Sequence, residues 1–200
     1  MHLALLEDRL EEGASVSLDA VWRVIYVVSG RIEVESVAFG ENQAWCDPDA
    51  CTVFATAAAR LWRWELRRDD PPGPTKMTQA VELPAKDVLL RCDRVDFPPH
   101  GIAYTHTHQG PGIRVLLRGG FRVDTGGHVL TLAPGDPWFE RGPDPVYAEA
   151  VGEEPASFVR VMVLPAALLG KSSIRYVKPD DQARPKSQTY TVLVDTPVNR

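Results

Sequence analysis

Short apolar segments separated by turn residues run along the whole chain, and this pattern constrains the fold more than any other feature of the sequence. Proline and glycine, present 17 and 15 times, fall between these segments. Several segments alternate strictly, as where Val159, Val161 and Val163 share one face. Alternation with a period of two is typical of β-strands, and many short strands indicate a sandwich or barrel. We predict strands at residues 21–28, 31–37, 52–57, 60–67, 86–95, 113–119, 128–132, 157–164 and 188–195.

The composition allows a folded core and argues against some partners. The chain has 200 residues, of which 44% are hydrophobic and 24% charged, which suits one sizeable domain or two small ones. A net charge of -5 argues against general nucleic-acid binding, because phosphate contacts need a basic surface. The sequence contains no apolar run of transmembrane length, and its start turns acidic too early for a signal peptide. We therefore expect a cytoplasmic protein that binds neither membranes nor nucleic acids.

The sequence also repeats itself. Residues 24–34 align with 113–123 when Gly30 is placed on Gly119, and residues 61–67 align with 158–164 when Arg63 is placed on Arg160. Matches in the same order indicate a duplicated β-module. We predict a degenerate first module and a complete second one, joined by a linker rich in charge, proline and glycine. The predicted boundaries are 1–70 for the first module, 71–82 for the linker, 83–165 for the second module and 166–200 for an extension with one strand.

Two histidines one residue apart form the most informative motif. His106 and His108 lie in "YTHTH", so on a strand both point to the same face, with Tyr104 beside them. Two imidazoles on one face either bind a divalent metal, with Zn, Fe, Mn and Ni all chemically possible, or line a pocket as polar side chains. Glu140, which shares a predicted face with Trp138, is the candidate third ligand of a two-histidine, one-carboxylate metal site.

Residues 97–147 resemble a cupin domain. The first cupin motif contains a glycine, a His-x-His pair, a glutamate and a closing glycine, and the second opens with a Pro-Gly-Asp turn. This chain has Gly101, His106, His108 and Gly119 in order, followed by Pro-Gly-Asp within 133–140. The resemblance implies a double-stranded β-helix, or jelly-roll barrel. With the internal repeat, it implies two barrels in tandem, a bicupin.

The sequence departs from the cupin pattern at two metal ligands. Gly112 stands where the motif has its glutamate, and Val146 or Tyr147 stands where the second motif has its histidine. The first module has no histidine in the corresponding hairpin, so we expect no metal there. Besides the metal candidates His106, His108 and Glu140, we predict four ligand-binding residues in the second barrel: Tyr104, Arg114, Trp138 and Tyr147.

Three functions remain open on the sequence alone. The first is binding of a small acidic molecule in the C-terminal barrel, without an assignable reaction. The second is a metal-dependent enzyme of dioxygenase, isomerase or lyase type that uses His106 and His108. The third is a structural or assembly protein, because one fold hosts many functions. The strand expected at 188–195 lies beyond the barrel and needs a pairing partner, so we also predict a homodimer.

Overall fold

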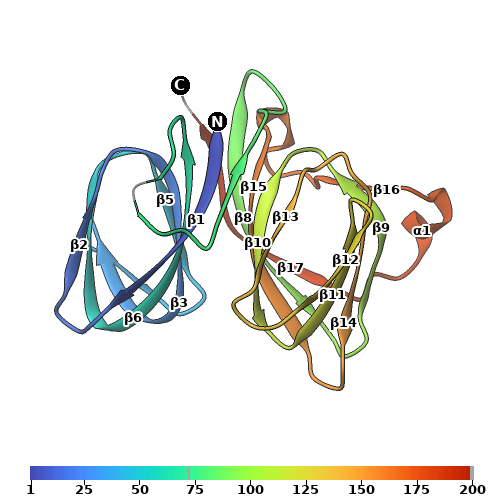
Figure 1. Ribbon diagram of the computed structural model, residues 1–200, viewed down its shortest axis with the longest axis horizontal. Helices are drawn as coiled ribbons and strands as arrows, with labels where there is room; N and C mark the ends of the chain where they lie inside the picture. The colour runs from blue at the N-terminus through green and yellow to red at the C-terminus, as the bar shows by residue number, and fades with distance from the viewer. Residues whose placement is uncertain (72, 199–200) are drawn as a thin grey trace. The chain divides into compact units, whose positions relative to one another are not determined.

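Strands make up nearly all of the regular structure in the computed structural model, which describes residues 1–71 and 73–198 (Figure 1). The predicted all-β class is confirmed. The chain divides into two compact units, Met1–Val81 and Glu82–Arg200. Within the described residues, no helix is both long and apolar enough to cross a membrane.

The first unit is built on one antiparallel sheet in which two long strands carry most of the pairing. Because β6 pairs with β2 near its start and with β1 towards its end, the sheet bends around an apolar core that includes Ile25, Val53 and Leu61. The strand order is β4-β3-β6-β1-β7, with β2 added on β6 and β5 on β3. The strands are β1 (His2–Leu10), β2 (Ser15–Leu18), β3 (Trp22–Val34), β4 (Val37–Gly40), β5 (Ala44–Asp47), β6 (Cys51–Arg67) and β7 (Met77–Ala80).

The glycines that the repeat aligned occupy similar backbone positions in their own units. Gly30 has a φ of +84°, and a Cβ there would collide with the carbonyl oxygen of Ala58. Gly119 has a φ of +77°, and a Cβ there would lie 2.6 Å from the carbonyl oxygen of Pro155. A positive φ and a close backbone contact both require a residue without a side chain. In each unit the glycine therefore lets one strand approach its neighbour closely.

The second unit consists of two five-stranded antiparallel sheets. One has the order β13-β10-β15-β8-β17 and the other β12-β11-β14-β9-β16. The elements are β8 (Val88–Phe97), β9 (Ile102–His108), β10 (Gly112–Arg118), β11 (Gly120–Thr125), β12 (His128–Leu132), β13 (Pro137–Glu140), β14 (Val146–Val151), β15 (Ala156–Pro165), a 3-10 turn (Ala166–Leu168), β16 (Ile174–Tyr176), α1 (Pro179–Ala183) and β17 (Thr189–Val198).

An aromatic cluster fills one end of the space between these two sheets. The rings of Phe97 and Phe121 lie with their centroids 5.0 Å apart, and those of Trp138 and Phe158 lie 5.1 Å apart. Phe97, Trp138 and Phe158 come from one sheet, and Phe121 comes from the other. Edge-to-face packing of this kind stabilises a core beyond the area it buries. The remaining space between the sheets holds the polar residues described below.

Several strands occur where none was predicted, namely β1, β2, β5, β7, β14 and β16. Residues 77–80, within the predicted linker 71–82, form β7 and pair with β1. The predicted extension 166–200 contains two strands rather than one, because Ile174–Tyr176 forms β16 against β9. Both strands are short edge strands held by backbone pairing, so their side chains show no clear alternation. The strand predicted near 188–195 is β17, and it pairs with β8 of its own unit.

Candidate functional site

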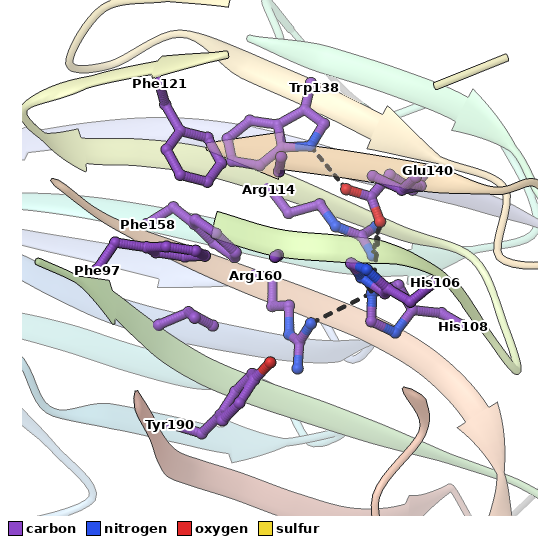
Figure 2. Close-up of a pocket in the computed structure, with 14 residues that line it drawn as sticks. Phe97, His106, His108, Arg114, Phe121, Trp138, Glu140, Phe158, Arg160 and Tyr190 are labelled. Carbon is purple, nitrogen blue, oxygen red and sulfur yellow. Dashed lines mark hydrogen bonds and ion pairs between the residues drawn. The ribbon is translucent and has the colours of Figure 1, made fainter. Parts of the chain in front are cut away.

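His106 and His108 lie inside the second unit with their rings in contact. Both are almost fully buried, and their Nε2 atoms are 3.2 Å apart. The Nδ1 atom of His106 is 2.7 Å from the backbone oxygen of Tyr104, and the Nδ1 atom of His108 is 3.3 Å from the hydroxyl of Ser173. Each imidazole is therefore held at one nitrogen and presents the other to the space between the sheets (Figure 2).

Tyr104 does not share the face of the histidines, contrary to the prediction. In β9, Ala103 pairs with Ala148 and His106 pairs with Val146, so β9 contains an extra residue between these pairs. Such a β-bulge reverses the alternation of side chains that follow it. The ring of Tyr104 instead lies under the cations of Arg184 and Lys186, at 5.1 and 5.5 Å from its centroid.

Arg114, Trp138 and Glu140 are brought together because β10 and β13 are neighbours. Arg114 pairs with Trp138 and Gly112 pairs with Glu140 in this ladder. The indole of Trp138 donates to Oε1 of Glu140 at 2.9 Å, and Nη2 of Arg114 lies 2.6 Å from Oε2. This last contact is an ion pair rather than a directed hydrogen bond, since neither atom meets hydrogen-bond geometry. All three side chains are buried.

Gly112 is required where the cupin motif has its glutamate. A Cβ at this position would lie 2.6 Å from the backbone oxygen of Val161 and 3.0 Å from Nη1 of Arg114. The Arg114 side chain turns back to donate from Nη1 to the carbonyl oxygen of Gly112. The guanidinium thus fills the space beside Gly112 that a longer side chain would need.

Tyr147, which was predicted to bind a ligand inside the second barrel, lies outside this group. It does not line the cavity between the two sheets. Its neighbours Val146 and Ala148 line that cavity, and alternation along β14 turns Tyr147 to the other face. There its hydroxyl donates to Glu149 at 2.9 Å.

Arg160 and Tyr190 also belong to the site, although neither was predicted from the sequence. Nη1 of Arg160 lies 3.4 Å from Nε2 of His108, and its Nε and Nη2 donate to Oδ2 of Asp93 at 3.0 and 2.8 Å. The ring of Tyr190 lies 5.4 Å from the guanidinium carbon of Arg160. A charged residue on the same strand face as Phe158 was the available signal for Arg160. Tyr190 comes from β17, whose place beside β8 no local pattern reveals.

Two cavities meet at Arg160 and Tyr190. The inner cavity, between the sheets, is lined by the histidines, Arg114, Glu140 and the aromatic cluster, and measures only about 20 Å³. That is room for about one water molecule. The outer pocket measures about 400 Å³ and lies between β8, β17 and residues 170–174. Arg160 and Tyr190 line both spaces, so they form the wall between them.

Burial and positive charge keep both imidazoles neutral. Burial lowers the pKa of His106, although the nearby charge of Glu140 opposes this. Burial, together with the charges of Arg160 and Arg114, holds the pKa of His108 well below its usual range. Burial also lowers the pKa of Arg114 to about 10, which still leaves it protonated at neutral pH. The inner cavity therefore has fixed cations and uncharged imidazoles.

The partners of the two imidazoles fix the hydrogen of one ring. A carbonyl oxygen only accepts, so Nδ1 of His106 carries hydrogen and its Nε2 presents a lone pair. Nε2 of His108 lies 3.2 Å from that lone pair, 3.5 Å from Oε2 of Glu140 and 3.4 Å from Nη1 of Arg160, so it faces both acceptors and a donor. Nδ1 of His108 pairs with the hydroxyl of Ser173, which lines the outer pocket. Hydrogen-bonding groups thus connect Ser173 through both imidazoles to the backbone of Tyr104.

In the arrangement described, these residues do not form a complete site for a divalent metal ion. The separation of 3.2 Å between the two Nε2 atoms suits two ligands of one ion, but the rest of the group does not. Glu140 is held by Arg114 and Trp138, and a second guanidinium, that of Arg160, faces His108. Two nearby cations oppose a third. Across the part of the chain that the structure describes, no three acidic, histidine or cysteine side chains are placed to hold a metal.

The fold is similar to that of solved cupin-barrel proteins. A variant of oxalate decarboxylase from Bacillus subtilis matches with a TM-score of 0.69 at 14% identity, over 92% of this chain and 73% of that chain. AerE from Microcystis aeruginosa matches with a TM-score of 0.64 at 10% identity, over 81% of this chain and 88% of that one. A cupin 2 conserved barrel domain protein from Leptotrichia buccalis matches with a TM-score of 0.50 at 13% identity, over 80% and 88%.

At 10–14% sequence identity, these structural matches show a shared fold and no more. They confirm that the chain has a cupin-type β-barrel architecture, as the resemblance in residues 97–147 implied. No protein-family model matches the sequence, and no curated protein matches it significantly.

Proposed function

We propose that the second unit is a metal-free binding module for a small acidic molecule. The observation that carries this proposal is the ion pair of Arg114 with Glu140 at 2.6 Å beside the two histidines. It supplies the carboxylate with a positive partner from the chain itself. A buried carboxylate that already has a cation gains little from a metal and would lose its partner on binding one. Arg160, the second cation, adds a positive charge that favours anions nearby.

The metal-dependent enzyme is the alternative, and two observations favour it. The imidazole nitrogens have the spacing of paired metal ligands. Bacillus subtilis oxalate decarboxylase, which shares the fold, has Mn(II) centres. Zn, Fe, Mn and Ni all remain chemically possible for two imidazoles and one carboxylate. The ion pair between Arg114 and Glu140 argues against the enzyme, because it would have to break before Glu140 could bind a metal.

Metal binding by an Arg114→Met variant tests the proposal directly. We expect the wild type to bind Mn²⁺ and Zn²⁺ no more tightly than a His106→Ala, His108→Ala double variant in calorimetric titrations. Arg114→Met should bind at least about tenfold more tightly than wild type, because removing a unit charge at contact distance exceeds the roughly 1.4 kcal/mol that this factor needs. Arg122→Met, which removes a half-exposed arginine, is the matched control. If the wild type binds metal and both histidines are needed for this, the metal-free proposal is wrong and the metal-dependent enzyme takes its place.

We further propose that the first unit is a reduced barrel without a ligand site, so that the chain is a tandem of two related modules. Arg63 pairs with Asp8 in the first unit as Arg160 pairs with Asp93 in the second. The sequence of the first unit contains only one histidine, at position 2. Its buried Trp62 and Trp64 occupy the strand that matches β15. A purely structural role is thus proposed for this unit alone.

A further inference from the structure

The outer pocket has the size of a ligand site, and its walls are fixed in place. At about 400 Å³ it lies within the range of about 300–1,000 Å³ that is usual for small-molecule sites. One wall is the turn at residues 170–174. Arg91 holds this turn, since Nη1 donates to the carbonyl oxygen of Lys171 at 2.7 Å and Nη2 donates to that of Leu168 at 2.6 Å. The pocket is therefore formed before any ligand arrives.

The charges around the outer pocket leave one cation unmatched. Arg91 pairs with Asp195 at 2.9 Å, and Arg160 pairs with Asp93 at 2.8 Å. Among the described residues, Lys171 has no acidic partner, and its Nζ donates to the backbone oxygen of Ala167 at 3.1 Å. An ammonium group has two further hydrogens to donate. A ligand with a single negative charge, placed beside Lys171, would therefore balance the charges of the pocket.

A serine next to Lys171 adds a neutral donor at that end. The hydroxyl oxygen of Ser172 accepts from the backbone N–H of Ile174 at 3.2 Å. Its own hydrogen is then directed elsewhere, because a hydroxyl both accepts and donates. Together, an ammonium and a hydroxyl match the two oxygens of a carboxylate.

The opposite wall of the pocket is apolar. Tyr190 and Val192 share one face of β17 and line the pocket, although 42% and 57% of their surfaces are exposed. Ile174, on the turn itself, adds a further apolar side chain to the pocket lining. Large exposed apolar side chains gathered in a concave site are typical of a surface that a ligand covers. The ligand should therefore have an apolar body.

We infer that the outer pocket binds a small monocarboxylic acid with an apolar or aromatic body. The carboxylate pairs with Lys171 and Ser172, and the body packs on Tyr190, Val192 and Ile174. This inference rests on the proposed metal-free binding function and gives its site and ligand class. At the inner end, the bound acid faces Arg160. There Asp93 Oδ1, which is buried and has no partner in the described structure, would take a donor group such as a ring hydroxyl.

Titration of the ¹⁵N-labelled full chain with benzoate tests this inference, with benzamide as the uncharged analogue. Benzoate should shift amide signals of residues 170–174 and 190–192, and benzamide should bind at least about fivefold more weakly. Lys171→Glu should weaken benzoate binding at least about tenfold, because it replaces an attraction with a repulsion. Lys86→Glu makes the same charge change at an exposed lysine outside the pocket and should have no effect.

The outcomes separate this inference from the proposed function. Equal binding of benzoate and benzamide, or unchanged benzoate binding by Lys171→Glu, would overturn the ligand class. Shifts confined to residues outside the outer pocket would overturn its location. Neither result changes the metal titration of Arg114→Met, which tests the metal-free function by itself. Tyr190→Ala, which removes part of the apolar wall, should weaken benzoate and benzamide alike.

Discussion

Nη2 of Arg114 lies 2.6 Å from Oε2 of Glu140, with both side chains buried beside two neutral imidazoles. Breaking such a pair from one side leaves a buried charge without a partner, which costs about 3–5 kcal/mol. We therefore expect Arg114→Met and Glu140→Gln each to lower the free energy of unfolding by about this amount. The double variant should lose much less than the sum of the two. Urea unfolding of the four proteins measures the coupling.

The pair of Arg122 with Glu149 offers a control for that cycle. Its side chains are 35% and 29% exposed, and the atoms are 3.0 Å apart. Partly exposed pairs contribute about 0.2–1 kcal/mol. An equally small coupling for Arg114 with Glu140 would contradict the role given to their ion pair.

Stability should depend on pH through the two histidines. Their pKa values are lowered in the folded state, so the unfolded chain binds more protons at mildly acidic pH. The contribution is fully present above the unfolded value of about 6.5 and is lost as the pH falls below it. We expect the free energy of unfolding to fall by up to about 1.4 kcal/mol per pH unit for each histidine. Chemical denaturation between about pH 7.5 and 5 measures this slope.

A His106→Gln, His108→Gln double variant is the comparison for the pH series. Glutamine cannot be protonated in this range, so the slope assigned to the histidines should disappear. If the double variant keeps the slope of the wild type, other groups cause it.

Removing a buried tryptophan from β6 should destabilise the first unit strongly. Trp62 and Trp64 are each 1% exposed, and their rings pack edge to face. Changing either to alanine should cost about 3–5 kcal/mol, measured by thermal melts. Phe54→Ala on the same strand, where the side chain is 42% exposed, should cost less than about 1 kcal/mol. Melting curves close to wild type for both tryptophan variants would contradict this prediction.

Gly119→Ala should cost more than Gly127→Ala, although both glycines have a positive φ. A Cβ at Gly119 meets the Pro155 oxygen at 2.6 Å, whereas at Gly127 nothing lies within 4 Å. Backbone strain alone costs about 1 kcal/mol or slightly more, and the steric contact adds about 1–3 kcal/mol. Equal losses in urea unfolding would show that the close approach of the strands is not needed.

The homodimer stays a prediction. The strand that motivated it, β17, pairs with β8 of the same unit and ends that sheet. Its bulge near Leu193 and its Pro197 restrict further pairing to its first residues. Sedimentation of the full chain should give a dimer, and Thr191→Pro should shift it towards monomer. A monomeric wild type would remove the prediction, and a dimer that resists Thr191→Pro would place the interface elsewhere.

Alternation and motif spacing predicted much of the fold and part of the site. Local patterns predicted strands β3, β6, β8, β10, β12, β15 and β17 and the residues His106, His108, Arg114 and Glu140, because a strand repeats every two residues and a family motif fixes its register. Tyr104 was misplaced because a bulge leaves no mark in the sequence of β9. Tyr190 was missed because its position depends on which strand β17 pairs with. Non-local pairing and single-residue irregularities are tertiary properties, so one sequence does not reveal them.

The bulge in β9 lies between Ala103 and His106, so side chains before it and after it alternate independently of one another. A change of one residue in the length of this strand is therefore tolerated at the bulge and not beyond it. Deleting Thr105 would restore regular alternation from Ala103 onwards and leave both imidazoles facing inwards. Deleting Thr107 instead would make the histidines adjacent in the chain, and His108 would turn outwards. The effect of deleting one residue on the histidine pair thus depends on where in β9 the deletion falls. In an aligned sequence, a one-residue gap just before the pair is compatible with both histidines still facing the interior.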